Sequence, residues 1–173
     1  MDLAGIEHAA EPIALADFDD FYRSRRDRVA RALALTLGDA HLAAEAADEA
    51  MTRAYQRWGR VGRYENPGGW VYRVGLNWAT SVLRRRNRSP KPLFDAATTD
   101  IAPLAEPSVL RALAELPVPQ RAVVICRFYL GLTEAETAAA LHVRPGTVKS
   151  RLHRALAHLR TRLDHLAPEA NND

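Results

Sequence analysis

The residues best suited to binding chemistry lie in the segment 132–154, where a run of small residues is followed by a basic run. Thr133 and Glu136 have the spacing of a capping box, which predicts that a helix begins there. A short turn, His142–Arg144, follows, and Pro145 suits the first position of a second helix. Two helices joined by so short a turn are typical of the helix-turn-helix, whose second helix enters the DNA major groove.

The second helix of this motif has a candidate binding face. If Val148 and Leu152 point to the core, the opposite face carries polar and basic side chains, namely Thr147, Lys149, Ser150, Arg151, His153 and Arg154. Such side chains reach base edges and phosphates. The first helix is expected to bury three residues, Ala135, Ala139 and Leu141, with Val143 between the two helices. The competing interpretation is an amphipathic bundle helix with a solvated basic face.

Aromatic residues alternate with arginines upstream of this motif, at Arg63, Tyr64, Trp70, Tyr72, Arg73, Asn77, Trp78 and Arg84–Arg86. Rings that stack on unpaired bases and arginines that hold phosphates are typical of single-strand binding. Four of the apolar residues have core spacing and are expected to be structural: Trp70, Val74, Trp78 and Leu83. The candidates for DNA contact are Tyr64, Arg73, Asn77, Arg84 and Arg85.

An acidic face is expected on the helix that precedes them. The polar residues of this helix share one side, at Glu45, Asp48, Glu49, Thr52 and Gln56. Acidic groups repel DNA, so this face suits a basic protein partner. The alternative is a helix face that is merely solvated.

The elements that would position these residues are all helical. Apolar spacing predicts helices at 17–37, from Asp39 (as N-cap) to about Trp58, and at 69–87, with a loop at Gly59–Gly69. Further helices are predicted at 108–116, 119–130, 133–141 and 145–164. The proline-rich segment 89–107 is expected to be a flexible linker. The sequence thus predicts an all-α chain with an extension (1–12), a helical domain (13–88), a second helical domain (108–166) and a tail (167–173).

Composition limits the other classes of function. The segment 17–88 carries 14 basic and 9 acidic residues, and 109–166 carries 9 basic and 4 acidic residues. Cys126 is the only cysteine, which excludes an internal disulfide, and its apolar neighbours Val124, Ile125 and Phe128 suggest a buried thiol. No glycine-rich phosphate loop, catalytic triad or paired-histidine motif is evident, so we expect no enzyme activity, cofactor or metal. Without a signal peptide or an apolar run of about 20 residues, a cytoplasmic protein with no membrane segment is expected.

The segment LTEAETAAALHVRPGTVKSRLHRAL resembles region 4 of sigma factors of the extracytoplasmic-function (ECF) group. The preceding VLRALAELPVPQRAVVICRFYLGL resembles the start of that region, and residues 17–88 resemble region 2. In region 2, Met51 and Tyr55 stand where Phe and Trp are usual, and Asp48 stands in place of the common Gln. Two further positions, in region 4, depart from the family pattern. Arg144 stands where Ser or Thr usually caps the helix, and His142 stands where Gly is common.

The resemblance implies a DNA-binding protein that recruits core RNA polymerase to promoters. In region 4, Lys149, Ser150, His153 and Arg154 would face bases of the −35 element, with Thr147 and Arg151 nearer the backbone. In region 2, the helix at 69–87 and the preceding loop would bind the −10 element and capture a flipped base. The acidic helix would dock on the clamp helices of the polymerase β′ subunit through Glu45, Asp48, Glu49, Thr52 and Arg53.

Further partners are implied in the same way: the polymerase β subunit and an anti-sigma factor.

The linker is long enough to join domains bound at the two promoter elements. A spacer of about 17 base pairs between the elements spans ~58 Å, and the linker of about 20 residues reaches roughly 66–72 Å when extended. The alternative function is a helix-turn-helix regulator that binds operators without docking on polymerase. It would explain residues 109–166 and leave the acidic face and the aromatic–arginine helix without a role.

Overall fold

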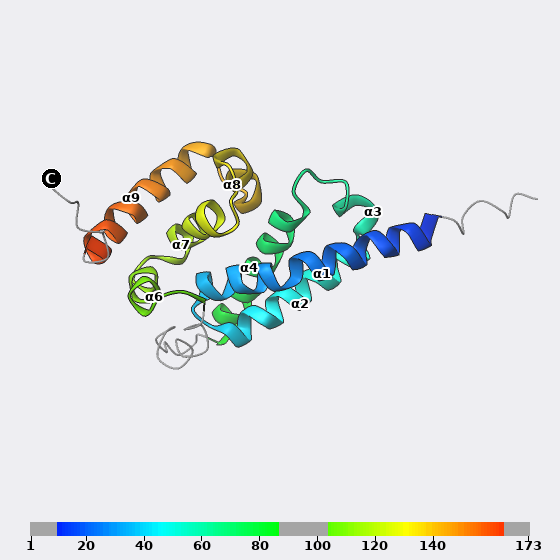
Figure 1. Cartoon of the computed structure of the whole chain (residues 1–173), viewed down its shortest axis with the longest axis horizontal. Helices are drawn as coiled ribbons and strands as arrows, with labels where there is room; N and C mark the ends of the chain where they lie inside the picture. The colour runs from blue at the N-terminus through cyan, green and yellow to red at the C-terminus, as the bar shows by residue number, and fades with distance from the viewer. Residues whose placement is uncertain (1–9, 87–103, 165–173) are drawn as a thin grey trace, which may run out of the picture.

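The computed structural model describes residues 10–86 and 104–164, and these residues form helices joined by short turns (Figure 1). The first group comprises α1 (Ala10–Leu37), α2 (Ala40–Gln56), α3 (Trp58–Val61) and α4 (Pro67–Arg86). The second comprises α6 (Pro107–Ala114), α7 (Val118–Val124), the π-helical segment η2 (Ile125–Tyr129), α8 (Glu134–Leu141) and α9 (Pro145–Leu163). The predicted all-α fold with two small helical domains is confirmed. Most of the predicted extension 1–12 and linker 89–107, and the tail 167–173, lie outside the described residues.

Helices α1, α2 and α4 pack together through small residues. The alanines of α2 at 43, 46, 47, 50 and 54 are all fully buried. Gly75 of α4 lies so close to its neighbours that a Cβ there would be 2.8 Å from Leu33 Cδ1 and 3.1 Å from the carbonyl oxygen of Ala46. Asp39 caps α2 by accepting a hydrogen bond of 2.8 Å from the backbone N–H of Leu42, as predicted.

The loop predicted at Gly59–Gly69 is shorter than expected. The short helix α3 occupies its start, and α4 begins at Pro67. The side chain of Asn66 accepts a hydrogen bond of 2.8 Å from the N–H of Gly69, which satisfies a free donor at the helix start. This local capping favours an α4 that begins two residues earlier than the apolar spacing suggested.

The second group of helices has a small core of its own, in which Val123, Ala138 and Val148 pack with Leu141, Val143 and Leu152. The prediction that α8 buries Ala135 and Ala139 is wrong, since both are exposed and the buried residues are Thr137, Ala138 and Ala140. Helix α8 packs on α9 on one side and on α4 on another, so its inner face is rotated from the one expected for an isolated helix-turn-helix.

The two groups are docked on each other. Helices α6–α9 lie against the C-terminal half of α1 and beside α4, while the N-terminal part of α1 extends away (Figure 1). One apolar cluster runs through both groups and includes Leu33, Tyr72, Leu113, Ile125 and Cys126. Cys126 is buried as predicted, whereas its neighbour Phe128 is 67% exposed. The aromatic ring of Phe128, in the π-helical segment, therefore faces solvent.

Candidate nucleic-acid interface

The start of α9 is fixed by a turn of unusual backbone. His142 follows α8 in the left-handed conformation, with φ 56° and ψ 44°, where glycine is usual at a helix C-terminus. Arg144 occupies the N-cap position in an extended conformation and makes no side-chain capping bond, and Pro145 follows at the first helical position. Half-buried Val143 packs between the helices, as predicted. The two departures from the region 4 pattern, His142 and Arg144, are thus accommodated without loss of the helix-turn-helix.

The capping box of α8 is present. The N–H of Thr133 donates to Glu136 Oε2 at 2.7 Å, and the N–H of Glu136 donates to Thr133 Oγ1 at 3.2 Å. The hydrogen bonds from the backbone and the side chain of Thr133 lower the pKa of Glu136, because they favour the ionised carboxylate. The first helix of the motif is therefore anchored at its start by its own residues.

The predicted donor face of α9 points to solvent. Val148 is fully buried and holds the helix against the core, which turns Lys149, Ser150, His153 and Arg154 outward as exposed residues. Thr147 and Arg151 are half-buried at the edges of this face. Within the part of the chain that the structure describes, none of its cations is paired with a carboxylate. The face can therefore offer its hydrogen-bond donors to an acceptor-rich partner such as DNA.

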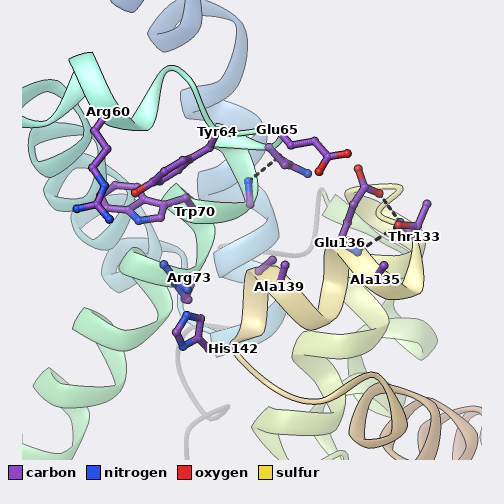
Figure 2. Close-up of a pocket in the computed structure, with 13 residues that line it drawn as sticks. Arg60, Tyr64, Glu65, Trp70, Arg73, Thr133, Ala135, Glu136, Ala139 and His142 are labelled. Carbon is purple, nitrogen blue, oxygen red and sulfur yellow. Dashed lines mark hydrogen bonds between the residues drawn. The ribbon is translucent and has the colours of Figure 1, made fainter.

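The residues predicted to contact the −10 element lie in two separate places. Tyr64 and Arg73 line a pocket of about 660 Å³ between the two groups of helices, with Arg60 and Trp70 on the same wall and Ala139 and His142 of the helix-turn-helix opposite (Figure 2). The other three, Asn77, Arg84 and Arg85, are exposed along α4 and line a second, open pocket of about 440 Å³. The second pocket also contains Arg53 of α2, so it is strongly basic.

The aromatic residues of α4 are mainly structural. Trp70 and Trp78 are half-buried and pack on the core together with Val74 and Leu83, as predicted. Tyr72, a member of the aromatic–arginine pattern, is not available for stacking, because it is fully buried and its hydroxyl lies 2.7 Å from Thr36 Oγ1. Burial also raises its pKa well above the usual value. Tyr64, which is half-buried and lines the first pocket, is thus the ring that remains a candidate for stacking on bases.

The acidic face of α2 is partly exposed and partly paired, with Asp48 exposed and Glu45 and Glu49 half-buried. Arg26 of α1 binds Asp48, Arg53 binds Glu49 with an N–O distance of 2.8 Å, and His41 lies 3.4 Å from Glu45. Thr52 is exposed, and its hydroxyl donates to the backbone carbonyl of Asp48 at 2.9 Å. Sequence reasoning missed the role of Arg26, since its separation of 22 residues from Asp48 leaves no local pattern.

Aromatic rings continue this face toward the end of α2. Tyr55 is 50% exposed and lies 5.1 Å from the buried Phe18, measured between ring centroids. Trp58 packs edge-on against Phe18 at 5.2 Å and lies 4.8 Å from Phe21. An exposed ring beside acidic residues suits a protein partner more than DNA, because it supplies apolar contact area where phosphate would be repelled. Sequence reasoning named Tyr55 in no site.

Three further observations bear on other kinds of site. Among residues 10–86 and 104–164, no group of three His, Cys, Asp or Glu residues is placed to hold a metal ion. Over the same residues no helix is long and apolar enough to cross a bilayer. Burial raises the pKa of the Cys126 thiol to about 12, so it is protonated at neutral pH.

Comparisons with known proteins place the chain in a family. Residues 107–159 match the family model described as Sigma-70, region 4. The chain is 33% identical over 153 residues to the RNA polymerase sigma-E factor of Streptomyces avermitilis, which covers 86% of each protein. It is 34% identical over 163 residues to the ECF RNA polymerase sigma factor SigM of Mycobacterium tuberculosis, covering 89% of this chain and 81% of that one.

Solved structures share the fold. The sigma factor RpoE of Bartonella quintana, solved in complex with the anti-sigma factor NepR, superposes with a TM-score of 0.71 at 19% identity, covering 86% of this chain and 97% of that one. CnrH, solved with the cytosolic domain of CnrY, gives a TM-score of 0.64 at 22% identity, covering 86% and 88%. The sequence identity to the sigma factors extends over both helical groups. The chain therefore belongs to the extracytoplasmic-function family of RNA polymerase sigma factors.

Proposed function

We propose that this sigma factor divides promoter recognition between its two helical groups. Residues 108–166 form region 4, in which α9 reads the −35 element, and residues 13–88 form region 2, in which α4 and the loop before it bind the −10 element. The observation that carries the first assignment is the unpaired, solvent-facing donor side of α9, held in place by buried Val148.

The roles of single residues follow from their exposure. In the −35 element, Lys149, Ser150, His153 and Arg154 contact bases, while Thr147 and Arg151, at the edges of the face, contact the backbone. In the −10 element, Asn77, Arg84 and Arg85 bind the phosphate backbone and adjacent bases. Tyr64 and Arg73 complete this surface once the pocket between the domains is open. The segment 89–107 joins the two regions as a linker.

Core polymerase binds the acidic face of α2. The residues assigned to this contact are Glu45, Asp48, Glu49, Thr52 and Arg53, and we add Tyr55 because it is exposed beside them. The expected sites on the enzyme are the β′ clamp helices for region 2 and the β subunit for region 4. The partly exposed carboxylates and the exposed Tyr55 ring of the same helix support a contact with a basic, partly apolar protein surface.

A regulatory partner and a cellular location complete the proposal. The structural neighbours were solved with NepR and CnrY, and we propose an anti-sigma factor as a partner of this chain as well. The protein acts in the cytoplasm, where polymerase and DNA are found, and it contributes binding rather than a catalytic reaction. Family membership favours this function over operator binding without polymerase.

Run-off transcription tests the proposal. Purified core polymerase is supplied with a library of promoter DNA, with and without the protein, and new start sites are expected only when both are present. Charge reversal of Glu49 together with Thr52→Lys should abolish them, whereas Asp20→Lys, at an exposed position of α1 outside every assigned binding surface, should not. A protein that binds duplex DNA alone and never associates with core polymerase would show the operator-binding alternative to be correct.

A further inference from the structure

One arginine belongs to two of the surfaces described above. Arg53 lies on α2 among the acidic residues proposed to bind polymerase, and its Nε and Nη2 each lie 2.8 Å from Oε1 of Glu49. The same side chain lines the open pocket of about 440 Å³ that α2 and α4 share, together with Asn77, Arg84 and Arg85. Arg53 therefore lies where the face for a protein partner meets the surface for the −10 element.

The charges around this pocket favour an anion. The described residues that line it include three guanidinium groups, those of Arg53, Arg84 and Arg85, and no carboxylate. Nε of Arg85 donates to the carbonyl oxygen of Ser81 at 3.3 Å, and among the described residues neither Arg84 nor Arg85 is paired with an acidic side chain. Guanidinium groups bind phosphate through parallel hydrogen bonds. A phosphate among the three cations would also reduce their mutual repulsion.

The other residues of the pocket suit a nucleic-acid strand. Asn77 and Ser81 are exposed and offer an amide and a hydroxyl group, while the half-buried Trp78 offers part of an aromatic ring. Single strands are bound by arginines that hold phosphates beside rings that contact bases. Asn77 is also one of the residues proposed to contact the −10 element. The ligand that fits this pocket is therefore a phosphodiester of an unpaired DNA strand.

Glu49 competes with such a phosphate for Arg53. The side chains of Arg53 and Glu49 are 43% and 37% exposed, so water screens their attraction and the pair can exchange partners. Both contacts from Arg53 go to Oε1, and within the part of the chain that the structure describes Oε2 of Glu49 accepts no hydrogen bond. A basic side chain of a partner can thus approach Glu49 through Oε2 while the pair is still formed.

We propose that Arg53 binds a phosphate of the −10 strand, and that Glu49 is its positioning residue, which holds the guanidinium until polymerase engages the carboxylate. Docking of a basic protein surface on α2 then releases one cation to the pocket on α4. The inference rests on the functions proposed above for α2 and α4, and it adds a direct connection between the two surfaces through one ion pair.

The expected effects are modest and measurable. An ion pair between partly exposed residues four apart in a helix changes an equilibrium about twofold. A single phosphate contact with a single strand contributes about 0.7 to the slope of log K against log salt concentration, which is about fivefold in affinity at roughly 0.1 M salt. The slope therefore reports the contact made by Arg53, and the twofold change reports the competition from Glu49.

Binding of a single-stranded oligonucleotide tests the phosphate contact. The probe carries the non-template −10 sequence of a promoter identified by transcription, and the full chain is titrated at several salt concentrations. Arg53→Gln should bind about fivefold more weakly at roughly 0.1 M salt, with a slope smaller by about 0.7. Arg53→Lys keeps the charge, so it should keep the slope although it loses the planar fork of the guanidinium.

The same titration tests the role of Glu49. In the free protein Glu49→Gln should raise the affinity for the probe about twofold, because it releases Arg53. Glu45→Gln is the matched control, since it removes the same charge from the same face but from a residue that lies 3.4 Å from His41, and it should raise the affinity less. In an Arg53→Gln background, Glu49→Gln should have no more effect than Glu45→Gln. With saturating core polymerase, Glu49→Gln and the unmodified protein should bind the probe equally.

Four outcomes would each overturn the proposal. They are an unchanged salt slope in Arg53→Gln, an equal gain in affinity for Glu45→Gln and Glu49→Gln, a twofold gain from Glu49→Gln that persists without Arg53, and a gain that persists with polymerase bound. Run-off transcription separates these failures from a failure of the proposed function. Start sites that still require the unmodified protein would leave the sigma function intact, whereas their absence would contradict that function itself.

Discussion

Arg26 of α1 binds both carboxylate oxygens of Asp48 on α2, with Nε 2.9 Å from Oδ1 and Nη2 3.0 Å from Oδ2. Burial alone would lower the pKa of Arg26, but its hydrogen bonds to Asp48 and Asp27 outweigh burial and raise it. The two side chains are 25% and 55% exposed, so the pair is only partly screened by water. Asp48 therefore ties α1 to α2 in addition to lying on the face proposed to bind polymerase.

Asp48→Asn is expected to lower the free energy of unfolding by about 1 kcal/mol, at the upper end for a partly exposed pair with two parallel hydrogen bonds. Urea unfolding measures the change, and a double-mutant cycle with Arg26→Gln isolates the coupling between the two side chains. Glu65→Gln, at an exposed site, should have almost no effect. A coupling energy near zero would mean that the pair is only a surface contact, and loss of transcription in Asp48→Asn would then report polymerase binding alone.

Gly75→Ala is expected to destabilise region 2 by about 1–3 kcal/mol, the usual cost of overpacking. The added methyl group would meet the Leu33 side chain and the backbone carbonyl of Ala46, and a carbonyl in a helix cannot move independently. Gly59→Ala is the matched control, because nothing lies within 4 Å of a Cβ at that site. The control should be neutral or slightly stabilising. Equal melting temperatures for Gly75→Ala and Gly59→Ala in thermal unfolding would contradict the close packing of α4.

Thr133→Ala is expected to destabilise region 4 by about 1 kcal/mol, because it removes half of the capping box. The same box makes stability depend on pH through Glu136. Its pKa is lowered in the folded protein, so its contribution is present above the usual value of 4.5 and is lost as the pH falls through the folded value. Unfolding measured between pH 6 and pH 3 should show a smaller acid-induced loss for Glu136→Gln than for the unmodified protein. Equal losses would indicate that the box does not contribute in solution.

The sequence predicts features that depend on neighbours along the chain. The capping box at Thr133 and the N-cap at Asp39 are local hydrogen-bond patterns, and both are present where spacing placed them. The buried side of α9 at Val148 was predictable for the same reason, since apolar residues recur every three or four positions in one helix. The outward direction of the donor face follows from that stripe.

Features that depend on contacts between distant segments were not predictable. Ala139 is exposed and Ala140 is buried because α8 packs against α4, where Gly69, which contacts Ala140, lies 71 residues earlier in the chain. Tyr72 belongs to an aromatic–arginine pattern, but its ring is enclosed where α4 meets the rest of the core. Arg121 resembles any other surface arginine in sequence, yet it lies buried among helix-end carbonyls. Its pKa falls to about 10, mainly through burial, so it remains charged at neutral pH.

The two arginines of the α9 face are expected to act differently on DNA. Arg151 is half-buried at the edge of the face, so Arg151→Ala should remove a phosphate contact and weaken binding equally for all sequences. The slope of log K against log salt concentration should then fall by about 0.9.

Arg154 is exposed at the centre of the face, so Arg154→Ala should instead cost about 1–3 kcal/mol and relax specificity at one position of the −35 element. Titrations of the full chain with −35 duplexes at several salt concentrations separate the two effects. Arg160→Ala, an exposed residue further along α9, is the control and should change neither quantity. If Arg154→Ala lowered the affinity for every sequence equally, Arg154 would be a backbone contact, and base recognition by α9 would depend on Lys149, Ser150 and His153.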